Sequence, residues 1–215
     1  MASLISLRDL GRTGYDDALT VQTECLSEVV EGQSGGFLLL TEHEPVLTLG
    51  ASFHPENLLF PAEWYAERGI GIRKTDRGGD ITYHGPGQIV AYPIFPLDLV
   101  GRDVHKWMRQ LEEVVILTLR RHGIEGQRLD VNSGVWVGEE KVCAIGIKVR
   151  RWVSMHGIAL NVNADLTPFK SIIPCGIKSH GVTSMAKVLG TDVDVDSVKQ
   201  TLVQEFGNVF GVEIA

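Results

Sequence analysis

Hydrophobic residues recur every three to four positions in three stretches of the chain, a spacing that predicts amphipathic helices. These stretches cover residues 15–30, 104–122 and 196–210. Thr13 and Asp16 resemble a capping box before the first helix. Asp103 is the expected N-cap of the second helix, and Gly123 is its expected stop.

Shorter stretches of hydrophobic or alternating residues predict β-strands. They cover residues 37–40, 46–49, 89–95, 135–137, 141–149 and 152–163. The last three follow one another through short turns, as in a series of hairpins. Because strands occur in clusters and helices stand apart, we expect an α+β fold in which a mixed or antiparallel sheet is flanked by helices. No repeat or linker divides the sequence, so residues 1–215 are expected to form a single domain.

Composition and charge narrow the class of protein. With 44% hydrophobic and 22% charged residues, the 215-residue chain is expected to fold rather than to be disordered. A net charge of −7 argues against non-specific nucleic-acid binding. The longest stretch without charged residues, 81–97, contains three prolines and cannot form a membrane helix. No targeting signal is visible, so we expect a cytoplasmic protein that binds neither nucleic acid nor membrane.

Residues 77–88 combine four glycines and a proline with several polar side chains. Gly78 and Gly79 would let the backbone lie against a ligand with no Cβ in the way. A glycine pair alone favours a turn before the strand 89–95, but the added Arg77, Tyr83 and His84 favour a ligand site. The segment is not expected to pack as a regular element.

The three cysteines differ in their surroundings along the chain. An odd number indicates no disulfide framework. Cys25 falls on the hydrophobic stripe of the first helix, and Cys143 alternates with Ile145 in a strand, so both are expected in the core. Cys175 stands between a proline and a glycine in a non-helical segment, which makes it the candidate reactive thiol.

Residues 141–164 contain no Asp or Glu and include four cations, most of which are expected on a solvated face. On local grounds Lys141 is an ordinary lysine beside a turn. Gly146 and Gly157 interrupt strands, which indicates a bulge or the close approach of a ligand or backbone. The seven histidines show no metal-binding spacing and no CxxC pair occurs, so no metal site is expected.

Taken together, these segments resemble the octanoyltransferases of lipoate biosynthesis, which move an octanoyl group from acyl carrier protein to a protein lysine. The resemblance rests on residues 77–88 (RGGDITYHGPGQ), 141–151 (KVCAIGIKVRR), 152–162 (WVSMHGIALNV) and 173–177 (IPCGI). Residues 44–50 (EPVLTLG) are similar to an early strand of the family. The similarity extends over about residues 40–185, in the expected order.

The resemblance implies the fold of the biotin and lipoate protein ligases and a single acyltransferase domain. It implies that Cys175 is the nucleophile that forms an acyl thioester and that Lys141 lowers its pKa. It also implies a substrate site lined by Arg77, Gly78, Gly79, Asp80, Ile81, Thr82, Tyr83, His84, Ala144, Ile145, Gly146, Gly157, Ile158 and Ala159. No cofactor, ATP or metal is implied. Cys143 departs from the family, in which alanine is expected, and its thiol could confuse thiol labelling.

The implied donor is octanoyl-acyl carrier protein, and the implied acceptors are the lipoyl domains of 2-oxoacid dehydrogenase acyltransferase subunits and the glycine cleavage H protein. Passing an acyl group between thioesters is nearly isoenergetic, which fits the absence of phosphate-binding motifs. Gly146 and Gly157 are expected to leave room for an eight-carbon chain. The basic residues 148–151 are expected to dock the acidic carrier protein.

Three alternatives remain open. The glycine-rich segment could hold an adenylate in an ATP-dependent lipoate or biotin protein ligase, although a ligase needs no nucleophilic cysteine. Cys175 could pair with His84, His156 or His180 in a cysteine hydrolase. A scaffold that binds carrier protein or lipoyl domains without turnover is the non-enzymatic alternative.

Overall fold

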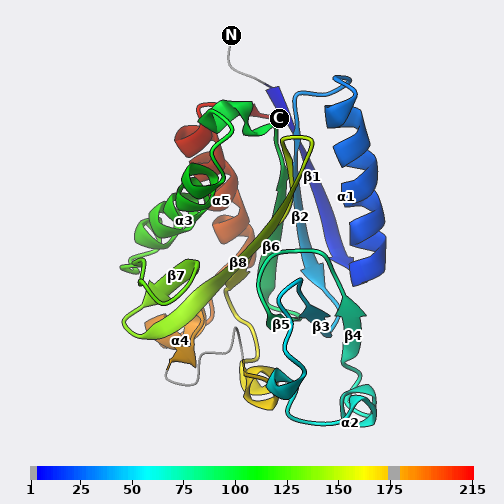
Figure 1. The fold of residues 1–215 in the computed structure, drawn as a ribbon. Helices are drawn as coiled ribbons and strands as arrows, with labels where there is room; N and C mark the ends of the chain where they lie inside the picture. Colours follow the sequence, from blue (N-terminus) through cyan, green and yellow to red (C-terminus); the bar gives the residue numbers. More distant parts are fainter. Residues whose placement is uncertain (1–3, 174–179) are drawn as a thin grey trace.

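The computed structural model describes residues 4–173 and 180–215, which form two β-sheets and surrounding helices (Figure 1). The large mixed sheet has the strand order β10-β8-β9-β6-β2-β1-β11, with β7 also paired to β8. Its strands are β1 (Leu4–Thr13), β2 (Phe37–His43), β6 (Gln88–Ile94), β7 (Gly134–Val137), β8 (Glu140–Arg150), β9 (Val153–Asn161), β10 (Gly181–Val182) and β11 (Glu213–Ile214). The small sheet, ordered β4-β3-β5, consists of β3 (Val46–Leu49), β4 (Gly71–Lys74) and β5 (Ile81–His84).

Helices cover both faces of the large sheet. The α-helices are α1 (Tyr15–Val30), α2 (Ala62–Ala66), α3 (Val104–Arg121), α4 (Met185–Leu189) and α5 (Val195–Phe210). Helices α3 and α5 lie on one face of the large sheet and α1 lies on the other (Figure 1). The main core fills the α3/α5 side and includes the fully buried Trp107, Leu111 and Phe206. The expected α+β architecture with a mixed sheet and the three long helices is confirmed.

The helix ends agree with the sequence in part. Asp103 caps α3 by accepting a hydrogen bond from the Lys106 backbone N–H at 3.0 Å, and Gly123 follows the helix with φ +76°. The predicted capping box of α1 is wrong. Thr13 is still in β1, where its hydroxyl lies 2.8 Å from that of Thr41, and Gly14 is the N-cap with no side-chain hydrogen bond. Pairing within the sheet outweighs the local capping pattern.

Two strands have no clear signal in the sequence. β1 buries little besides Ile5, so it lacks the hydrophobic pattern of a strand, and its pairing with β2 and β11 holds it in the sheet. β5 lies inside the glycine-rich segment for which we expected no regular element. It pairs antiparallel with β3 and buries Ile81 and Tyr83 in the core of the small sheet.

The small sheet and the loop before β5 lie over the α1 face of the large sheet (Figure 1). The backbone N–H of Gly78 donates to the Ile147 carbonyl of β8 at 2.8 Å, which fixes the loop on that strand. A pocket forms between the two sheets as a result. None of the helices within residues 4–173 and 180–215 has the length and apolar character needed to cross a membrane.

Candidate active site

A β-bulge in β8 turns Lys141 toward the pocket. β7 pairs Val135 with Cys143 but Trp136 with Lys141, so Val142 is an extra residue in β8. Lys141 consequently lines the same pocket as Ala144, although strict alternation would place residues three apart on opposite faces. The bulge therefore gives a specific direction to a lysine that looks ordinary in the sequence.

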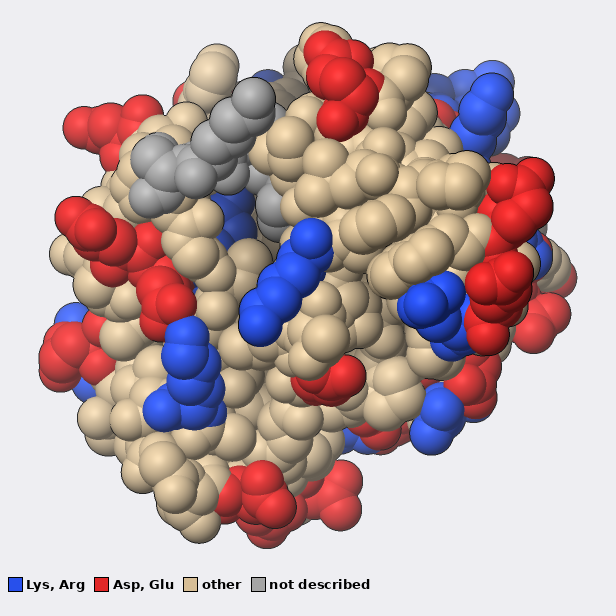
Figure 2. Space-filling model, turned by 90° about the horizontal axis from the view of Figure 1, so that it is seen from below, with Lys and Arg blue, Asp and Glu red and all other residues tan. Residues whose placement is uncertain are grey.

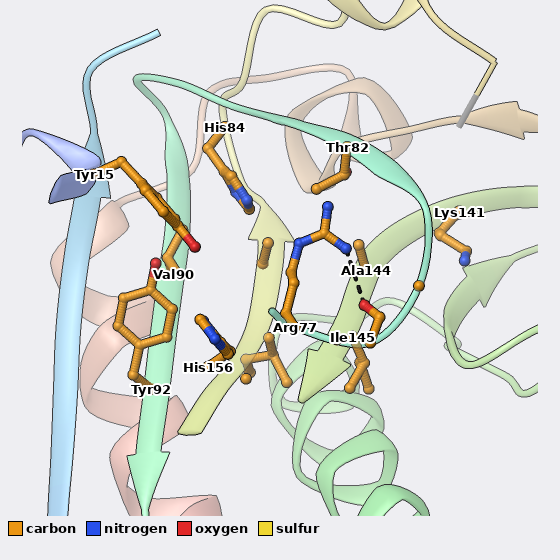
Figure 3. A pocket seen from close by; sticks show the side chains of 16 residues that line it. Tyr15, Arg77, Thr82, His84, Val90, Tyr92, Lys141, Ala144, Ile145 and His156 are labelled. Atoms are coloured by element: carbon orange, nitrogen blue, oxygen red, sulfur yellow. Dashed lines mark hydrogen bonds between the residues drawn. The ribbon is translucent and has the colours of Figure 1, made fainter. Parts of the chain in front are cut away.

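The pocket receives residues from the loop before β5, from β5, β6, β8 and β9, and from the start of α1 (Figure 3). Its empty volume, which includes space open to solvent at the mouth, is about 520 Å³. It is lined by Tyr15, Arg77, Gly78, Gly79, Thr82, His84, Val90, Tyr92, Lys141, Ala144, Ile145, Gly146, His156, Gly157, Ile158 and Ala159. Figure 3 shows Lys141 on one side and Tyr15 and Tyr92 on the opposite side.

The Lys141 ammonium is held where β7 meets the pocket. It donates to the Asn132 side-chain oxygen and, at 3.0 Å, to the Ser133 carbonyl. It also lies 4.7 Å from the centre of the Trp136 ring. Only 9% of Lys141 is exposed, so its charge acts in a largely desolvated environment.

Arg77 anchors the glycine-rich loop. Its buried guanidinium donates to the Thr48 carbonyl at 2.6 Å, to the Thr48 hydroxyl, and to the Asp80 carbonyl at 2.8 Å. Asp80 points away from the pocket: it accepts from Asn57 at 2.6 Å and from the backbone of Ile81 at 2.8 Å. The loop is thus held from both sides, and Gly78 and Gly79 present backbone to the pocket.

His84 is a neutral link in a hydrogen-bond chain. Burial lowers its pKa to about 3. Its Nδ1–H donates to Gln88 Oε1 at 2.7 Å, and its Nε2 accepts from the Thr48 hydroxyl at 3.3 Å. Gln88 in turn donates to Asn161 at 2.9 Å, and Asn161 donates to the Thr183 carbonyl at 3.0 Å. The hydrogen bonds of His84 therefore help to hold β5, β6 and β9 together.

The side of the pocket opposite Lys141 is aromatic and polar (Figure 3). The Tyr92 hydroxyl donates to His43 Nε2 at 2.6 Å, and the Tyr15 hydroxyl donates to Thr75 at 2.9 Å. Burial raises the pKa of both phenols and lowers that of His43. These groups are uncharged at neutral pH, and Tyr15 and Tyr92 line the pocket on the side away from Lys141.

His156 has a strained backbone at the same side. Its φ of +56° lies in the left-handed region, which non-glycine residues rarely adopt. The Gln22 side chain accepts a hydrogen bond from its backbone N–H at 2.9 Å, and its Nε2 lies 2.9 Å from Asp76. Burial lowers the pKa of His156, although Asp76 opposes that shift.

The structure brings most of the predicted substrate-site residues together in this pocket. Asp80, Ile81 and Tyr83 do not line it, because Asp80 faces the loop 54–57 and the other two lie in the small-sheet core. Cys175 lies outside the described residues. Four more residues line the pocket that the sequence did not identify as pocket residues: Tyr15, Val90, Tyr92 and His156. The sequence carries only a local signal for them, such as the alternation of Val90 and Tyr92 along one strand.

The close backbone approach expected at the two strand glycines is confirmed, and both glycines also line the pocket. A Cβ at Gly157 would lie 2.2 Å from the Ala91 carbonyl oxygen of β6, and a Cβ at Gly146 would lie 2.8 Å from that of Gly78. Both glycines thus permit close backbone approach. The small side chains that leave space in the pocket are those of Ala144 and Ala159.

The remaining thiols are confirmed as core residues. Cys25 and Cys143 are both fully buried. Burial raises the pKa of Cys25 and raises that of Cys143 to about 12. Neither thiol has the exposure or the low pKa of a reactive cysteine.

The basic segment expected to dock carrier protein begins beside the pocket and runs away from Lys141. Lys148 pairs with Asp76, and Arg150 and Arg151 lie at the β8–β9 turn, nine residues along β8 from Lys141. Nine residues of strand span about 30 Å. At the end of the molecule seen in Figure 2, acidic side chains lie mostly toward the edge, and the middle is largely uncharged with a few lysines or arginines.

Comparison with known proteins identifies the family and the fold of the chain. The model of the family "Lipoyl protein ligase A/B catalytic domain" matches residues 14–207. An octanoyltransferase of Thermoanaerobacter sp. (strain X514) is 46% identical over 207 residues, covering 96% of this chain and 90% of the relative. A bi-partite lipoate protein ligase structure of Thermoplasma acidophilum, solved in work on the ligase and its E2 lipoyl domain, has TM-score 0.72 and 17% identity, covering 100% and 86% of the two chains. A biotin protein ligase structure of Aquifex aeolicus has TM-score 0.55 and 14% identity, covering 96% and 69%.

The fold is therefore the one shared by lipoate and biotin protein ligases, as the sequence resemblance implied. Within that class, the chain belongs to the lipoyl protein ligase A/B catalytic domain family, and it is an enzyme of the acyltransferase type. No group of three or more His, Cys, Asp or Glu side chains in the described part of the chain is arranged to hold a metal ion.

Proposed function

We propose that the protein transfers an octanoyl group from octanoyl-acyl carrier protein to a specific lysine of lipoyl domains, through a thioester on Cys175, as a step of lipoate biosynthesis. The observation that supports this most is the pocket itself: small and apolar side chains of β8 and β9 meet the ammonium of Lys141 at one side. Each methylene of an acyl chain buried against these apolar side chains would contribute about 0.8 kcal/mol to binding.

In the first step, the Cys175 thiolate attacks the carbonyl carbon of the donor thioester. A new C–S bond forms, the bond to the phosphopantetheine sulfur breaks, and the released thiolate takes up a proton. In the second step, the acceptor lysine attacks the acyl-cysteine as a neutral amine. An amide forms, Cys175 leaves as thiolate, and the amine loses a proton. The ammonium of Lys141 suits both steps because it stabilises a nearby thiolate, which attacks in the first step and leaves in the second.

The pairing of β10 supports the partnership of Lys141 with Cys175. Val182 pairs with Lys141, and the Thr183 N–H donates to the Lys141 carbonyl at 2.9 Å. Cys175 precedes Val182 by seven residues in the sequence. A thiolate needs such a cation to be populated at neutral pH, because the usual pKa of cysteine is about 8.5.

Intact-mass spectrometry tests the nucleophile. Wild-type protein incubated with octanoyl-acyl carrier protein should gain one octanoyl group, and Cys175→Ala should gain none. Cys143→Ala, which removes a buried thiol of the same pocket region, is the matched control and should still be acylated. An adduct that persists in Cys175→Ala would overturn the proposed intermediate.

The reaction is separated from its alternatives in the same assay. Transfer to a lipoyl domain should proceed without ATP and should be lost when the acceptor lysine is replaced by arginine. ATP-dependent use of free octanoate would instead indicate a ligase. Release of octanoate without an acceptor, as fast as transfer, would indicate a hydrolase. For that activity His84 is poorly suited, because both ring nitrogens are already hydrogen-bonded.

The role of Lys141 is tested by the pH dependence of Cys175 alkylation. We expect Lys141→Ala to raise the apparent pKa of the thiol, since a neighbouring cation is lost. Lys106→Ala, at an exposed lysine of α3, is the control and should leave the profile unchanged. Superimposable profiles of Lys141→Ala and wild type would remove the proposed role.

A further inference from the structure

We propose that Glu112 of α3 is a positioning residue that fixes Lys141 in the pocket by holding the segment 128–134. This inference rests on the proposed role of Lys141. Glu112 does not line the pocket, but it is a buried carboxylate with only 2% exposure. A charge so deeply buried requires partners, and two of those of Glu112, Arg128 and Gly134, are the two ends of this segment.

One carboxylate oxygen of Glu112 binds the backbone directly. Its Oε1 accepts from the Gly134 N–H at 3.1 Å, at the first residue of β7. Gly134 lies against the lysine: a Cβ there would be 3.2 Å from Lys141 Cε and 3.3 Å from its Nζ. The carboxylate therefore fixes the piece of backbone that packs on the end of the lysine side chain.

The other oxygen fixes the beginning of the same segment. Glu112 Oε2 accepts from Arg128 Nε at 3.0 Å and from Arg109 at 2.9 Å. Arg128 also donates to the Arg109 carbonyl at 2.9 Å and to Glu113 at 2.6 Å. Both ends of the segment are thus attached to one turn of α3.

Two acceptors of hydrogen bonds from the Lys141 ammonium lie between these attachments. They are the Asn132 side-chain oxygen and the Ser133 carbonyl. Gln127 forms a backbone bridge with Trp136, but residues 128–133, which follow it, belong to no helix or strand. The position of these acceptors therefore depends strongly on the bonds of Glu112 to Arg128 and Gly134. Without Glu112, Lys141 keeps its charge but loses the fixed geometry that directs it.

The test is a double-mutant cycle read by the pH dependence of Cys175 alkylation and by kcat for transfer. Glu112→Gln should raise the apparent pKa of alkylation in the same direction as Lys141→Ala, and should lower kcat about tenfold with KM within about twofold. In the Lys141→Ala background it should add nothing to either readout. The matched control is Glu113→Gln: Glu113 shares Arg128, but the Gly134 N–H donates to Glu112, so both readouts should stay at the wild-type level.

The outcomes separate this inference from the proposed function. If Lys141→Ala shifts the alkylation profile and Glu112→Gln does not, the inference is overturned and the role of Lys141 stands. If Glu112→Gln has the same effect in wild type and in Lys141→Ala, it acts by disturbing the fold and not through Lys141, and the inference is again overturned. If Lys141→Ala itself has no effect, both fail. Should Glu112→Gln not fold, Arg128→Lys at the partly exposed arginine should give a smaller change in the same direction, and a wild-type profile would refute the proposal.

Discussion

Acidification from pH 7 to pH 5 should destabilise this protein, because imidazoles are buried uncharged around the pocket. The pKa of His84 falls from about 6.5 in the unfolded chain to about 3 in the fold. The unfolded chain therefore binds more protons than the folded one between these values. Stability rises with pH, is fully present above the unfolded pKa, and is lost as pH falls toward the folded pKa.

The size of the effect follows from these two pKa values. Between pH 7 and pH 5, His84 alone should lower the free energy of unfolding by about 2 kcal/mol. Burial lowers the pKa of His43 and His156 as well, and both add to the loss in the same direction. With a urea m-value of about 2 kcal/mol/M, the contribution of His84 shifts the unfolding midpoint by about 1 M.

Urea unfolding followed by tryptophan fluorescence measures this shift, since Trp107 and Trp136 are buried in the fold. His84→Gln should reduce the pH dependence by about 2 kcal/mol, whatever its effect on stability at pH 7. His105→Gln, at an exposed histidine of α3, should leave the pH dependence as in wild type. Equal midpoints at pH 5 and pH 7 in the wild type, or an unchanged shift in His84→Gln, would refute the reasoning.

Three further predictions concern thiols, the pocket and the sheet. With a pKa of about 12, Cys143 has a thiolate population about 3000-fold below that of an ordinary thiol, and Cys25 is fully buried with a raised pKa. Iodoacetamide should therefore leave folded Cys175→Ala unlabelled; rapid labelling seen by intact mass would contradict this. Ala144→Leu places about three carbons in the pocket and should displace about three methylenes of an octanoyl chain. The lost burial should lower kcat/KM for octanoyl donors about 50-fold but barely affect the shorter butyryl donors. Equal losses for both donors would exclude a pocket for the chain. Gly157→Ala brings a Cβ against the Ala91 carbonyl and should lower the free energy of unfolding in urea by about 1–3 kcal/mol. An unchanged free energy of unfolding would show that the sheet accommodates the added methyl group.

The parts of the fold that follow from local periodicity were predictable from the sequence. The helices α1, α3 and α5 each carry a hydrophobic stripe, and β8 and β9 alternate through a short turn. β1 was not predictable, because nearly all of its side chains are at least partly exposed and only its neighbours in the sheet hold it. β5 was hidden for a related reason: glycines surround it, and its partner β3 is far away in sequence.

The candidate site shows the same limit at single residues. The composition of residues 77–88 indicated a ligand site, and the glycines at 146 and 157 indicated close approach in the strands. The other pocket residues of 141–159 came from the resemblance to the octanoyltransferases and not from composition. The direction of Lys141 depends on the bulge at Val142, which becomes visible only when β7 is paired with β8. The contribution of Tyr15 depends on helix α1 packing across the sheet from a distant part of the chain.

The charges around the pocket explain why one lysine could have a large effect. Among the described residues that line it, Lys141 and Arg77 carry charge, and neither Asp nor Glu is present. The imidazoles and phenols are held uncharged by burial, which lowers the pKa of His84 and raises that of Tyr92. In such a weakly polarisable space, a cation acts on a nearby anion with little cancellation. In the reaction that we propose, this field would favour the thiolate that starts acyl transfer. It would also favour the negative oxygen that develops when the thioester carbonyl is attacked, so burial of the neutral groups would itself contribute to the chemistry.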